Sequence, residues 1–295
     1  MSDRAITPEF LRRIPLPQPA EDGDKDQRGR VMVIGGSTAV PGAVLLAATA
    51  ALRAGAGKLQ IATCQSIAMH LGLAVPEALV LGLPETASGE IDPRAAGQLS
   101  ERIARCDAVL IGPGMLDEEA AAALTADLLD CDPGFAFVLD AGALGHLKDA
   151  SSVLARHQGR LVITPHAGEM ANLLGIDKHQ VLHNPAEVAV ETASLLHCVV
   201  VLKGSRTYIA APDRGTWTYS DGNVGLATSG SGDTLAGIVA GLLARGVTPL
   251  HAAQWSVFLH GEAGNRLAQA RGTLGFLARE LLAEIPRLMA DFNDV

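Results

Sequence analysis

Short apolar runs alternate with longer helix-like segments along most of the chain. The runs are VMVI (31–34), KLQIAT (58–63), AVLI (108–111), FAFVLD (135–140), RLVIT (160–164) and CVVVLKG (198–204). Segments rich in alanine and leucine follow them, as in GGSTAVPGAVLLAATAALRAG after the first run. Strands that alternate with helices predict an α/β fold, with a central, mostly parallel sheet and helices on both faces.

Two later runs have a different pattern. RTYIAA (206–211) and GTWTYS (215–220) alternate apolar and polar positions and are separated only by PDR. This pattern predicts a small antiparallel hairpin in which Trp217 and Tyr219 pack against the core. Three helix patterns close the chain, and no repeat or linker interrupts it. We therefore expect a single domain over residues 1–295, with residues 1–24 as an N-terminal extension.

Composition agrees with such a fold. Hydrophobic residues make up 48% of the 295 residues and aromatic residues only 3%. The core must therefore consist of Ala, Val, Leu and Ile, which suits parallel strands covered by helices. The net charge is -9 without a basic stripe, which argues against nucleic-acid binding. Anionic small ligands are still compatible with this charge, because backbone amides can hold a phosphate.

The location of the protein is predicted from cysteine usage and from apolar segments. The four cysteines are scattered and form no CxxC pair, which fits a reducing compartment. The N-terminus has no apolar signal core. The longest apolar run, 39–52, is too short to span a bilayer. These features predict a soluble, cytoplasmic protein without a membrane partner.

The segment NVGLATSGSGDTLAG contains the most suggestive chemistry. Gly230 and Gly232 allow consecutive N–H groups to point at one place, and a helix starting at Ser231 adds the positive end of its dipole. This arrangement favours a phosphate or a developing anion. Asp233 could simply support the helix start. The two glycines and the preceding polar loop favour a functional role.

Ligands in such folds bind beyond the carboxyl ends of the strands, so the loops there are candidates. Each has a plain alternative: GGS (35–37) as a tight turn, GPG (112–114) as a helix breaker, and His166 as a helix cap. Glu169 could complement a helix dipole or orient a ligand, and Asp140 could orient a ligand or a metal. His179 and His183 would share a helix face, but no third ligand is suggested, so no metal site is predicted. Neither a Walker motif nor a Rossmann fingerprint is present.

The loops, taken in order, resemble those of the NAD(P)H-hydrate dehydratases, which have the ribokinase-like fold. The matching segments are VMVIGGS with PGA and AALRAGAG, VLIGPGM, VLDAGAL, ITPHAGEMANLLG, VVLKGSRTYI and NVGLATSGSGDTLAG. GSGD alone is shared by many ribokinase-like kinases, whereas TPHAGEMANLL together with GGS, PGA and GPG is far more specific. The chain departs from the family pattern at Val40, where an aromatic residue is frequent, and at Ser229, where glycine is common.

The resemblance implies an activity and assigns roles. Members use ADP or ATP to dehydrate the (6S) hydrate of NADH or NADPH, by phosphorylating the ring hydroxyl and eliminating phosphate. The hydrated dinucleotide would contact Ala43, Gly112, Gly114, His166 and Asp233. The adenine nucleotide would contact Lys203, Gly204, Ser205, Arg206, Thr207, Gly230, Ser231 and Gly232.

Within that mechanism, Asp233 would be the catalytic base that accepts the hydroxyl proton. The amides of residues 230–232 would stabilise the transferred phosphoryl group, and Mg²⁺ would bridge phosphates without a protein cage. The resemblance also implies a homo-oligomer, with a tetramer as one form. About 30 residues before the first strand are too few for an epimerase domain, so a separate epimerase is expected.

Two other functions remain open at this point. A vitamin-precursor kinase of the same fold would share GSGD and release a stable phosphorylated alcohol. A nucleotide-binding regulatory protein with a vestigial site would bind without turnover, which the intact Asp233 disfavours. The choices between ADP and ATP, and between the NADH and NADPH hydrates, also stay open.

Overall fold

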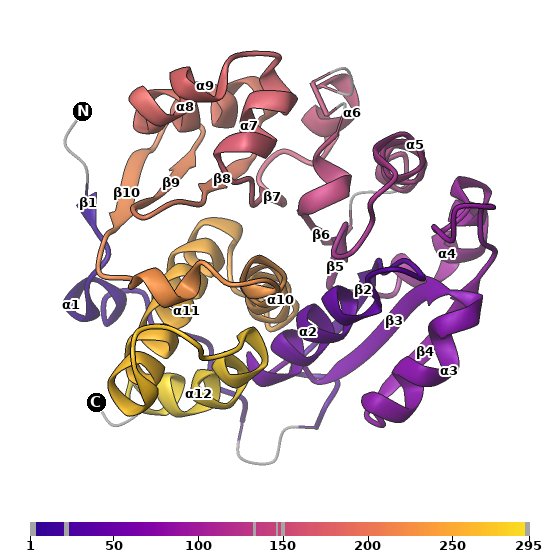
Figure 1. Ribbon diagram of the computed structural model, residues 1–295, viewed down its shortest axis with the longest axis horizontal. Coiled ribbons are helices and arrows are strands. Elements are labelled where there is room, and N and C mark those ends of the chain that lie inside the picture. The colour runs from indigo at the N-terminus through magenta and orange to yellow at the C-terminus, as the bar shows by residue number, and fades with distance from the viewer. Residues whose placement is uncertain (1–3, 21–23, 132–133, 146, 149–150, 293–295) are drawn as a thin grey trace.

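The computed structural model describes residues 4–20, 24–131, 134–145, 147–148 and 151–292. A ten-stranded sheet forms its centre (Figure 1). From one edge to the other, the strands are β1 (Arg4–Ala5), β10 (Gly215–Tyr219), β9 (Thr207–Ala211), β8 (Val199–Leu202), β7 (Leu161–Ile163), β6 (Ala136–Leu139), β5 (Ala108–Ile111), β2 (Arg30–Ile34), β3 (Lys58–Cys64) and β4 (Ala78–Leu83).

The seven strands from β8 to β4 in this order are parallel to their neighbours, which confirms the predicted α/β fold. The predicted hairpin is also confirmed, because β9 pairs antiparallel with β10. It extends the main sheet, since β9 also pairs antiparallel with β8. Strand β4 was not predicted, because its apolar run ALVLGL follows the apolar helix α3 (Gln65–Ala74) after a short turn and does not stand out from it.

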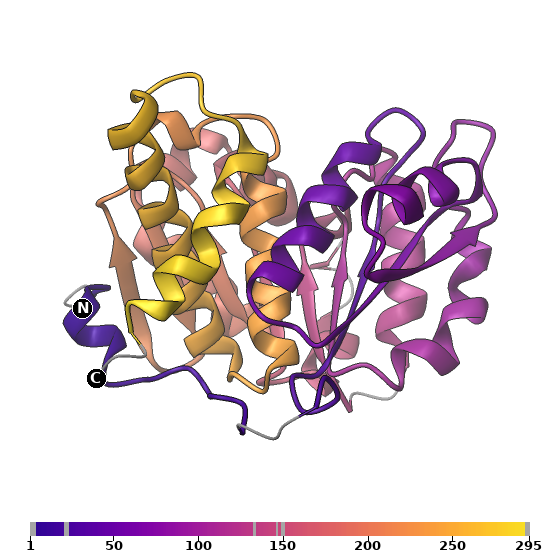
Figure 2. The same cartoon turned by 90° about the horizontal axis from the view of Figure 1, so that it is seen from below.

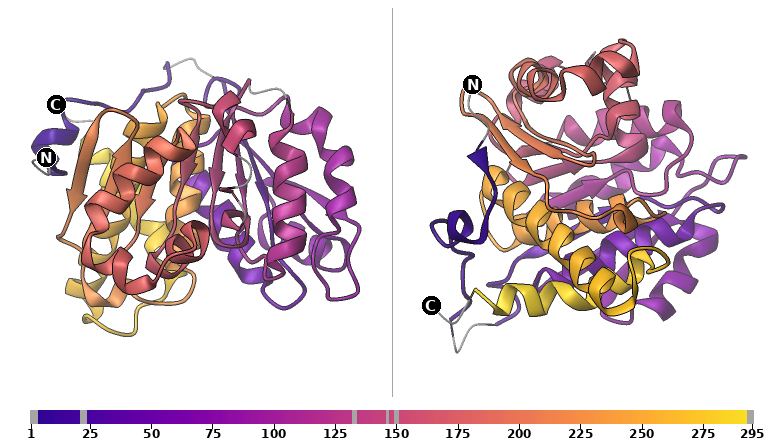
Figure 3. Two further views of the ribbon diagram at one scale, coloured as in Figure 1. Left: turned by 90° about the horizontal axis from the view of Figure 1, so that it is seen from above. Right: turned by 60° about the vertical axis from the view of Figure 1, so that its left-hand side comes forward.

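Helices cover both faces of the sheet. One face carries α2 (Pro41–Arg53), α10 (Ser231–Ala244), α11 (Pro249–Arg271) and α12 (Ala278–Ala290), which stand in front in Figure 2. The opposite face, in front in the left panel of Figure 3, carries α5 (Glu118–Leu129), α7 (Ala167–Leu174), α8 (Lys178–His183) and α9 (Pro185–Leu196). The other helices are α1 (Pro8–Leu11), α3 (Gln65–Ala74), α4 (Ala96–Ile103), α6 (Ser151–Arg156) and the 3₁₀ turns η1 (Pro93–Ala95), η2 (Ala141–Leu144) and η3 (Val224–Leu226).

Side chains of the central strands alternate between the two cores. Val31 and Val33 of β2 belong to the core under α2 and α10, whereas Met32 and Ile34 belong to the core on the other face. All four side chains are fully buried. Successive side chains of a strand point to opposite faces, so a continuous apolar run is what a strand buried on both sides requires.

Helices α2 and α10 pack with their backbones in close contact. A Cβ atom on Gly237 would lie 2.2 Å from the carbonyl oxygen of Ala47, and one on Gly241 would lie 2.4 Å from that of Ala51. Larger residues would push the helices apart, so glycine at these two positions sets their spacing. The consequence for the site is that the starts of α2 and α10 are held at a fixed distance.

The predicted N-terminal extension packs onto the rest of the chain. Strand β1 pairs with β10, and the side chains of Ile6 and Leu11 are buried in the core. The indole Nε1 of Trp255, in α11, donates a 2.8 Å hydrogen bond to the carbonyl of Ile14. The predicted packing role of Trp217 and Tyr219 is confirmed, because both are 5% exposed. Within the described ranges, no helix is long and apolar enough to cross a membrane.

Candidate active site

The candidate loops converge at the carboxyl edge of the parallel strands. Strands β2, β5, β6, β7 and β8 lie side by side, so the loops that follow them share one edge of the sheet. Direct contacts tie these loops together: the amide of Gly36 donates to the carbonyl of Pro113 at 2.7 Å, and the amide of Lys203 donates to that of Pro165 at 2.8 Å. The structure thus brings the segments that follow different strands into one region.

The GPG turn is built by close backbone contacts. Gly112 has φ +121°, and a Cβ there would lie 1.7 Å from the carbonyl oxygen of Asp140. Gly114 has φ +74°, and its Cβ would lie 3.0 Å from the Cβ of Ala43. Positive φ and these contacts both require glycine. The turn is therefore more than a helix breaker, because it places the start of α2 beside the end of β6.

Lys203 joins two acidic side chains at this edge, and one of them also binds a threonine. Its Nζ lies 2.9 Å from Oδ1 of Asp140 and 3.6 Å from Oε2 of Glu169. The hydroxyl of Thr164 donates to the same Oδ1 at 2.7 Å. The side chain of Asp140 is 2% exposed, so this carboxylate is a buried anchor. Asp140 and Glu169, whose roles the sequence left open, both hold the ammonium of Lys203.

The same ammonium lies at the start of α10. A Cβ on Gly232 would be 3.3 Å from Nζ of Lys203. Burial would lower the pKa of Lys203, but the charges of Asp140, Glu169 and Asp233 outweigh it and raise this pKa. The ammonium therefore stays charged across the neutral range. Positive charge from the side chain and from the helix dipole meet at one place.

Asp233 is poised to act as a base near neutral pH. Burial, followed by the negative charge of Asp140, raises the pKa of Asp233 to about 6, with Lys203 opposing the rise. Above that pH the carboxylate is ionised, and it binds a proton more strongly than an ordinary aspartate does. A general base works best when its pKa lies near the working pH.

The local contacts of His166 fix the form of its ring. As the N-cap of α7, its Nδ1 accepts hydrogen bonds from the amides of Gly168 and Glu169, both at 3.0 Å. Glu169 completes a capping box, because its Oε2 accepts from the amide of His166 at 2.7 Å. With Nδ1 an acceptor, the proton of the neutral ring is on Nε2, which belongs to an exposed side chain. The capping alternative is confirmed, and Nε2 lies 3.6 Å from Oε1 of Glu169, beyond ordinary hydrogen-bond length.

The GSGD turn has an inner support that the sequence did not reveal. Gly230, the N-cap of α10, has φ +85°, and a Cβ there would lie 2.4 Å from Cδ1 of Leu46. The hydroxyl of Ser231 lies 2.8 Å from Nε2 of His260, in α11. Burial lowers the pKa of His260 to about 4, so this imidazole is neutral at physiological pH. A single histidine inside a long helix carries no local sequence signal, which is why His260 was missed.

The remaining residues assigned to the nucleotide lie in the turn between β8 and β9. Gly204, Ser205 and Arg206 are exposed, and Thr207 begins β9. Lys203 differs from them because its side chain turns toward Asp140 and Glu169. The contacts of all these residues with ligands remain predictions.

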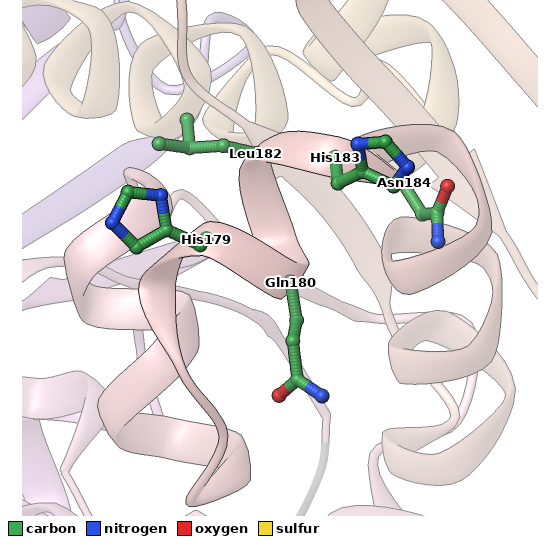
Figure 4. A pocket seen from close by; sticks show the side chains of 5 residues that line it. All are labelled: His179, Gln180, Leu182, His183 and Asn184. Atoms are coloured by element: carbon green, nitrogen blue, oxygen red, sulfur yellow. The ribbon is translucent and has the colours of Figure 1, made fainter.

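Two surface hollows lie away from this edge. One, of about 580 Å³, is lined by His179, Gln180, Leu182, His183 and Asn184 (Figure 4). The two imidazoles lie apart in this view and do not face a common point. Across the described part of the chain, no group of three His, Cys, Asp or Glu side chains could hold a metal ion. Both histidine side chains are exposed to solvent.

The second hollow, of about 410 Å³, lies at the amino ends of β2 and β3 and is rich in basic residues. Asp26 pairs with Lys58 and with Arg30, and Nη1 of Arg30 donates to the carbonyl of Arg105 at 3.1 Å. These contacts tie the turn before β2 to neighbouring segments. The basic side chains of Lys58 and Arg30 thus have a structural role. Neither hollow is lined by a residue of the predicted site.

Comparisons with known proteins identify relatives that match nearly the whole chain. The ADP-dependent (S)-NAD(P)H-hydrate dehydratase of Xanthomonas campestris is 50% identical over 97% of this chain and 96% of its own length. The crystal structure of the ADP/ATP-dependent NAD(P)H-hydrate dehydratase of Bacillus subtilis, co-crystallised with ATP and Mg²⁺, matches with a TM-score of 0.84 at 31% identity. The match covers 99% of this chain and 99% of the Bacillus subtilis chain. A ribokinase-like superfamily protein of Enterococcus faecalis matches with a TM-score of 0.77 at 26% identity, over 98% of this chain and 96% of its own.

Some relatives are longer. The bifunctional NAD(P)H-hydrate repair enzyme of Moorella thermoacetica is 40% identical over 99% of this chain, which spans 54% of that protein. A family profile described as NAD(P)H-hydrate dehydratase matches residues 31–287. Because this match covers most of the chain, and because the fold is ribokinase-like, the chain belongs to the NAD(P)H-hydrate dehydratase family.

Proposed function

We propose that the protein is an ADP-dependent NAD(P)H-hydrate dehydratase, a lyase that restores NADH or NADPH from the (6S) hydrate and so repairs nicotinamide nucleotides. ATP is the alternative phosphoryl donor. The observation that carries the proposal is the position of Asp233, which lies in the first turn of α10 with a pKa of about 6 and near the ammonium of Lys203. A base and an anion-stabilising centre at one place are what phosphoryl transfer to a hydroxyl requires.

The first step transfers a phosphoryl group. The carboxylate of Asp233 accepts the proton of the ring hydroxyl while the hydroxyl oxygen attacks the terminal phosphorus of ADP. The new O–P bond forms as the bond from phosphorus to the AMP oxygen breaks. Backbone amides at the start of α10 donate to the phosphoryl oxygens, and the helix dipole favours their negative charge. AMP is the first product.

The second step eliminates phosphate. The electron pair of the ring nitrogen expels the phosphate as the C–O bond breaks, and the neighbouring ring carbon loses a proton to a phosphate oxygen. The ring double bond is restored, and hydrogen phosphate and NAD(P)H leave. Asp233 then releases the hydroxyl proton to water. Phosphorylation makes this step possible because hydroxide is a poor leaving group and phosphate a good one.

The two ligands would occupy adjacent parts of the site. The hydrated dinucleotide is assigned to Ala43, Gly112, Gly114, His166 and Asp233. In support of this, Gly114 of the GPG turn lies directly against Ala43. In this arrangement Nε2–H of His166 donates to the dinucleotide and does not act as a base. The adenine nucleotide is assigned to residues 203–207 and 230–232, at the β8–β9 turn and the start of α10.

Magnesium is proposed to enter with the nucleotide and to neutralise phosphate charge. The side chains at the site do not form a metal cage: Lys203 already holds Asp140 and Glu169, and the described residues include no group of three metal-binding side chains. Mg²⁺ commonly keeps several waters and binds phosphates with few protein ligands. It is therefore part of the co-substrate rather than a resident cofactor.

The setting of the enzyme is also proposed. We expect one catalytic domain over the chain, a homo-oligomer such as a tetramer, and a cytoplasmic location. Three free cysteines, Cys64, Cys106 and Cys198, are buried as small apolar side chains, which suits a reducing compartment. The bifunctional relatives support a functional link to an epimerase that interconverts the hydrate epimers.

A turnover assay tests the function directly. Purified protein is mixed with Mg²⁺ and hydrated NADH or NADPH, with ADP and ATP in parallel reactions, and the absorbance of reduced nicotinamide is followed. Recovery of absorbance with equimolar release of AMP or ADP supports the proposal and identifies the donor. Nucleotide binding without recovery contradicts it. In that case, a screen of small alcohols for stable phosphorylated products would test the kinase alternative.

A further inference from the structure

We propose that Lys203 is a catalytic residue whose ammonium contacts the transferred phosphoryl group, and that Asp140 and Glu169 are positioning residues that hold it there. This inference rests on the proposed function for the identity of the phosphoryl acceptor. It changes the role of Lys203 from general nucleotide binding to stabilisation of the group that moves.

The ammonium is held from two directions. Asp140 ends β6 and lies 2.9 Å from Nζ, and Glu169 on α7 lies 3.6 Å from it. Thr164, which follows β7 and is fully buried, donates to the same oxygen of Asp140. An anchor that is buried and hydrogen-bonded on another side has little freedom to move. The ammonium of Lys203 is thus held at a fixed point at the edge of the sheet.

That fixed point adjoins the anion-binding turn. Gly232 is the second residue of α10, and its missing Cβ would be 3.3 Å from Nζ of Lys203. The backbone of Gly232 does not have the positive φ that favours glycine, in contrast to that of Gly230. Glycine at position 232 is therefore explained by the space it leaves between the helix start and the ammonium. A phosphoryl oxygen that accepts from the α10 amides would lie within reach of Nζ.

The charges around the site also support placing the ammonium of Lys203 beside the transferred phosphoryl group. Asp140, Glu169 and Asp233 bring three carboxyl groups to a region that must accept a phosphate, and Lys203 opposes them. Without the ammonium, these carboxylates would repel the phosphoryl group before transfer. During transfer Lys203 donates hydrogen bonds and keeps its proton, since Asp233 takes the hydroxyl proton. The O–P bond to the acceptor forms and the O–P bond to AMP breaks, as in the proposed reaction.

A comparison of ADP with AMP isolates this role, because AMP lacks the phosphoryl group that is transferred. In Lys203→Gln, we expect AMP to bind within about twofold of wild type, because base and ribose contacts are retained. ADP should bind on the order of 10-fold more weakly, and kcat should fall about 10²–10³-fold, as for other lost donors to a transition-state anion. Lys148→Gln is the matched control, because it removes one charge from an exposed lysine whose Nζ donates to the carbonyl of Leu174.

Asp140→Asn is the second variant, and it keeps the shape of the anchor and an oxygen for Thr164. We expect kcat to fall about 10-fold and the acidic limb of the pH–rate profile to move to lower pH, because a negative charge near Asp233 is lost. A merely structural role would reduce the melting temperature and leave that limb in place. The pH profile also keeps the inference testable if Lys203→Gln folds poorly.

The outcomes separate this inference from the proposed function. Equal weakening of ADP and AMP in Lys203→Gln, or unchanged ADP binding, overturns the assignment of Lys203. A wild-type protein that binds ADP but never converts the hydrate removes the proposed function, while the ADP-to-AMP comparison still decides the role of Lys203. Failure of the wild-type protein to bind either nucleotide overturns both.

Discussion

The ammonium nitrogen of Lys203 lies 2.9 Å from Oδ1 of Asp140, although the two residues are 63 positions apart in the sequence. Asp140 follows β6 and Lys203 follows β8, and β7 lies between these strands. Thr164, at the end of β7, donates to the same carboxylate oxygen. Three neighbouring strand ends therefore share one buried acceptor, which fixes the cation beside the start of α10.

Asp233→Asn should remove most of the turnover while the protein stays folded. General-base catalysis contributes about 10²–10⁴-fold, so kcat should fall within this range. In the wild type, kcat/KM should decline as the pH falls through about 6, because Asp233 becomes protonated there. Steady-state kinetics from pH 5 to pH 9 measure both effects. Normal activity in the variant would exclude Asp233 as the base.

The same substitution should make the folded protein more stable at neutral pH. An unfolded aspartate has a pKa of about 3.9, whereas that of Asp233 is about 6, so the ionised form is disfavoured by folding. Above pH 6 this lowers the unfolding free energy by about 3 kcal/mol, and the effect disappears as the pH falls below about 4. Denaturant unfolding of both proteins at pH 4 and pH 7.5 measures it. A stabilisation that is equal at both pH values would contradict this origin.

Two substitutions of His166 should separate its capping role from its binding role. In His166→Asn, the side-chain oxygen can replace Nδ1 as the N-cap acceptor of α7, but the Nε2–H donor is lost. We expect a nearly unchanged melting temperature and a KM for the hydrate that rises about 10–100-fold. His166→Ala should show the same KM effect and also lose about 1 kcal/mol of stability. Loss of a limb of the pH–rate profile in His166→Asn would instead indicate a base.

Gly112→Ala should be strongly destabilising, whereas Gly42→Ala in the nearby PGA segment should not. A Cβ at position 112 would lie 1.7 Å from the carbonyl oxygen of Asp140, and φ there is +121°. Backbone strain of this kind costs about 1–3 kcal/mol, to which the collision adds. A Cβ at Gly42 meets nothing within 4 Å, and alanine there should be neutral or stabilising by up to about 1 kcal/mol. Thermal unfolding compares the two, and equal melting temperatures would refute the packing argument.

Local sequence patterns were sufficient to predict most of the strands of the sheet. Short apolar runs identified the strands β2, β3 and β5 to β8, and the PDR spacer identified the antiparallel pair β9 and β10. Strand β4 was missed because its apolar run follows the apolar helix α3 after a short turn, so the run does not stand out as a separate element. Strand β1 consists of two residues, and its pairing with β10 depends on the fold of the whole chain.

In the site, too, features with a local sequence signature could be predicted, whereas contacts between distant segments could not. The glycines of GPG and GSGD could be located from the sequence, because turns and helix starts have local signatures. The ties from Lys203 to Asp140 and from Ser231 to His260 could not, because each joins elements that only the sheet order and helix packing bring together. The capping role of His166 was foreseen as an alternative, whereas its tautomer follows only from the two amides at Nδ1.

The glycine contacts between α2 and α10 have a consequence for how tightly ligands are held. Gly237 and Gly241 press against the backbone of α2, and both helices begin at loops assigned to ligands. Loops that are anchored on two tightly packed helices lose little conformational entropy when a ligand binds. A larger part of the favourable contact energy then contributes to the affinity. The preorganisation of the two proposed subsites would thus be encoded at glycines inside α10, away from the loops assigned to ligands.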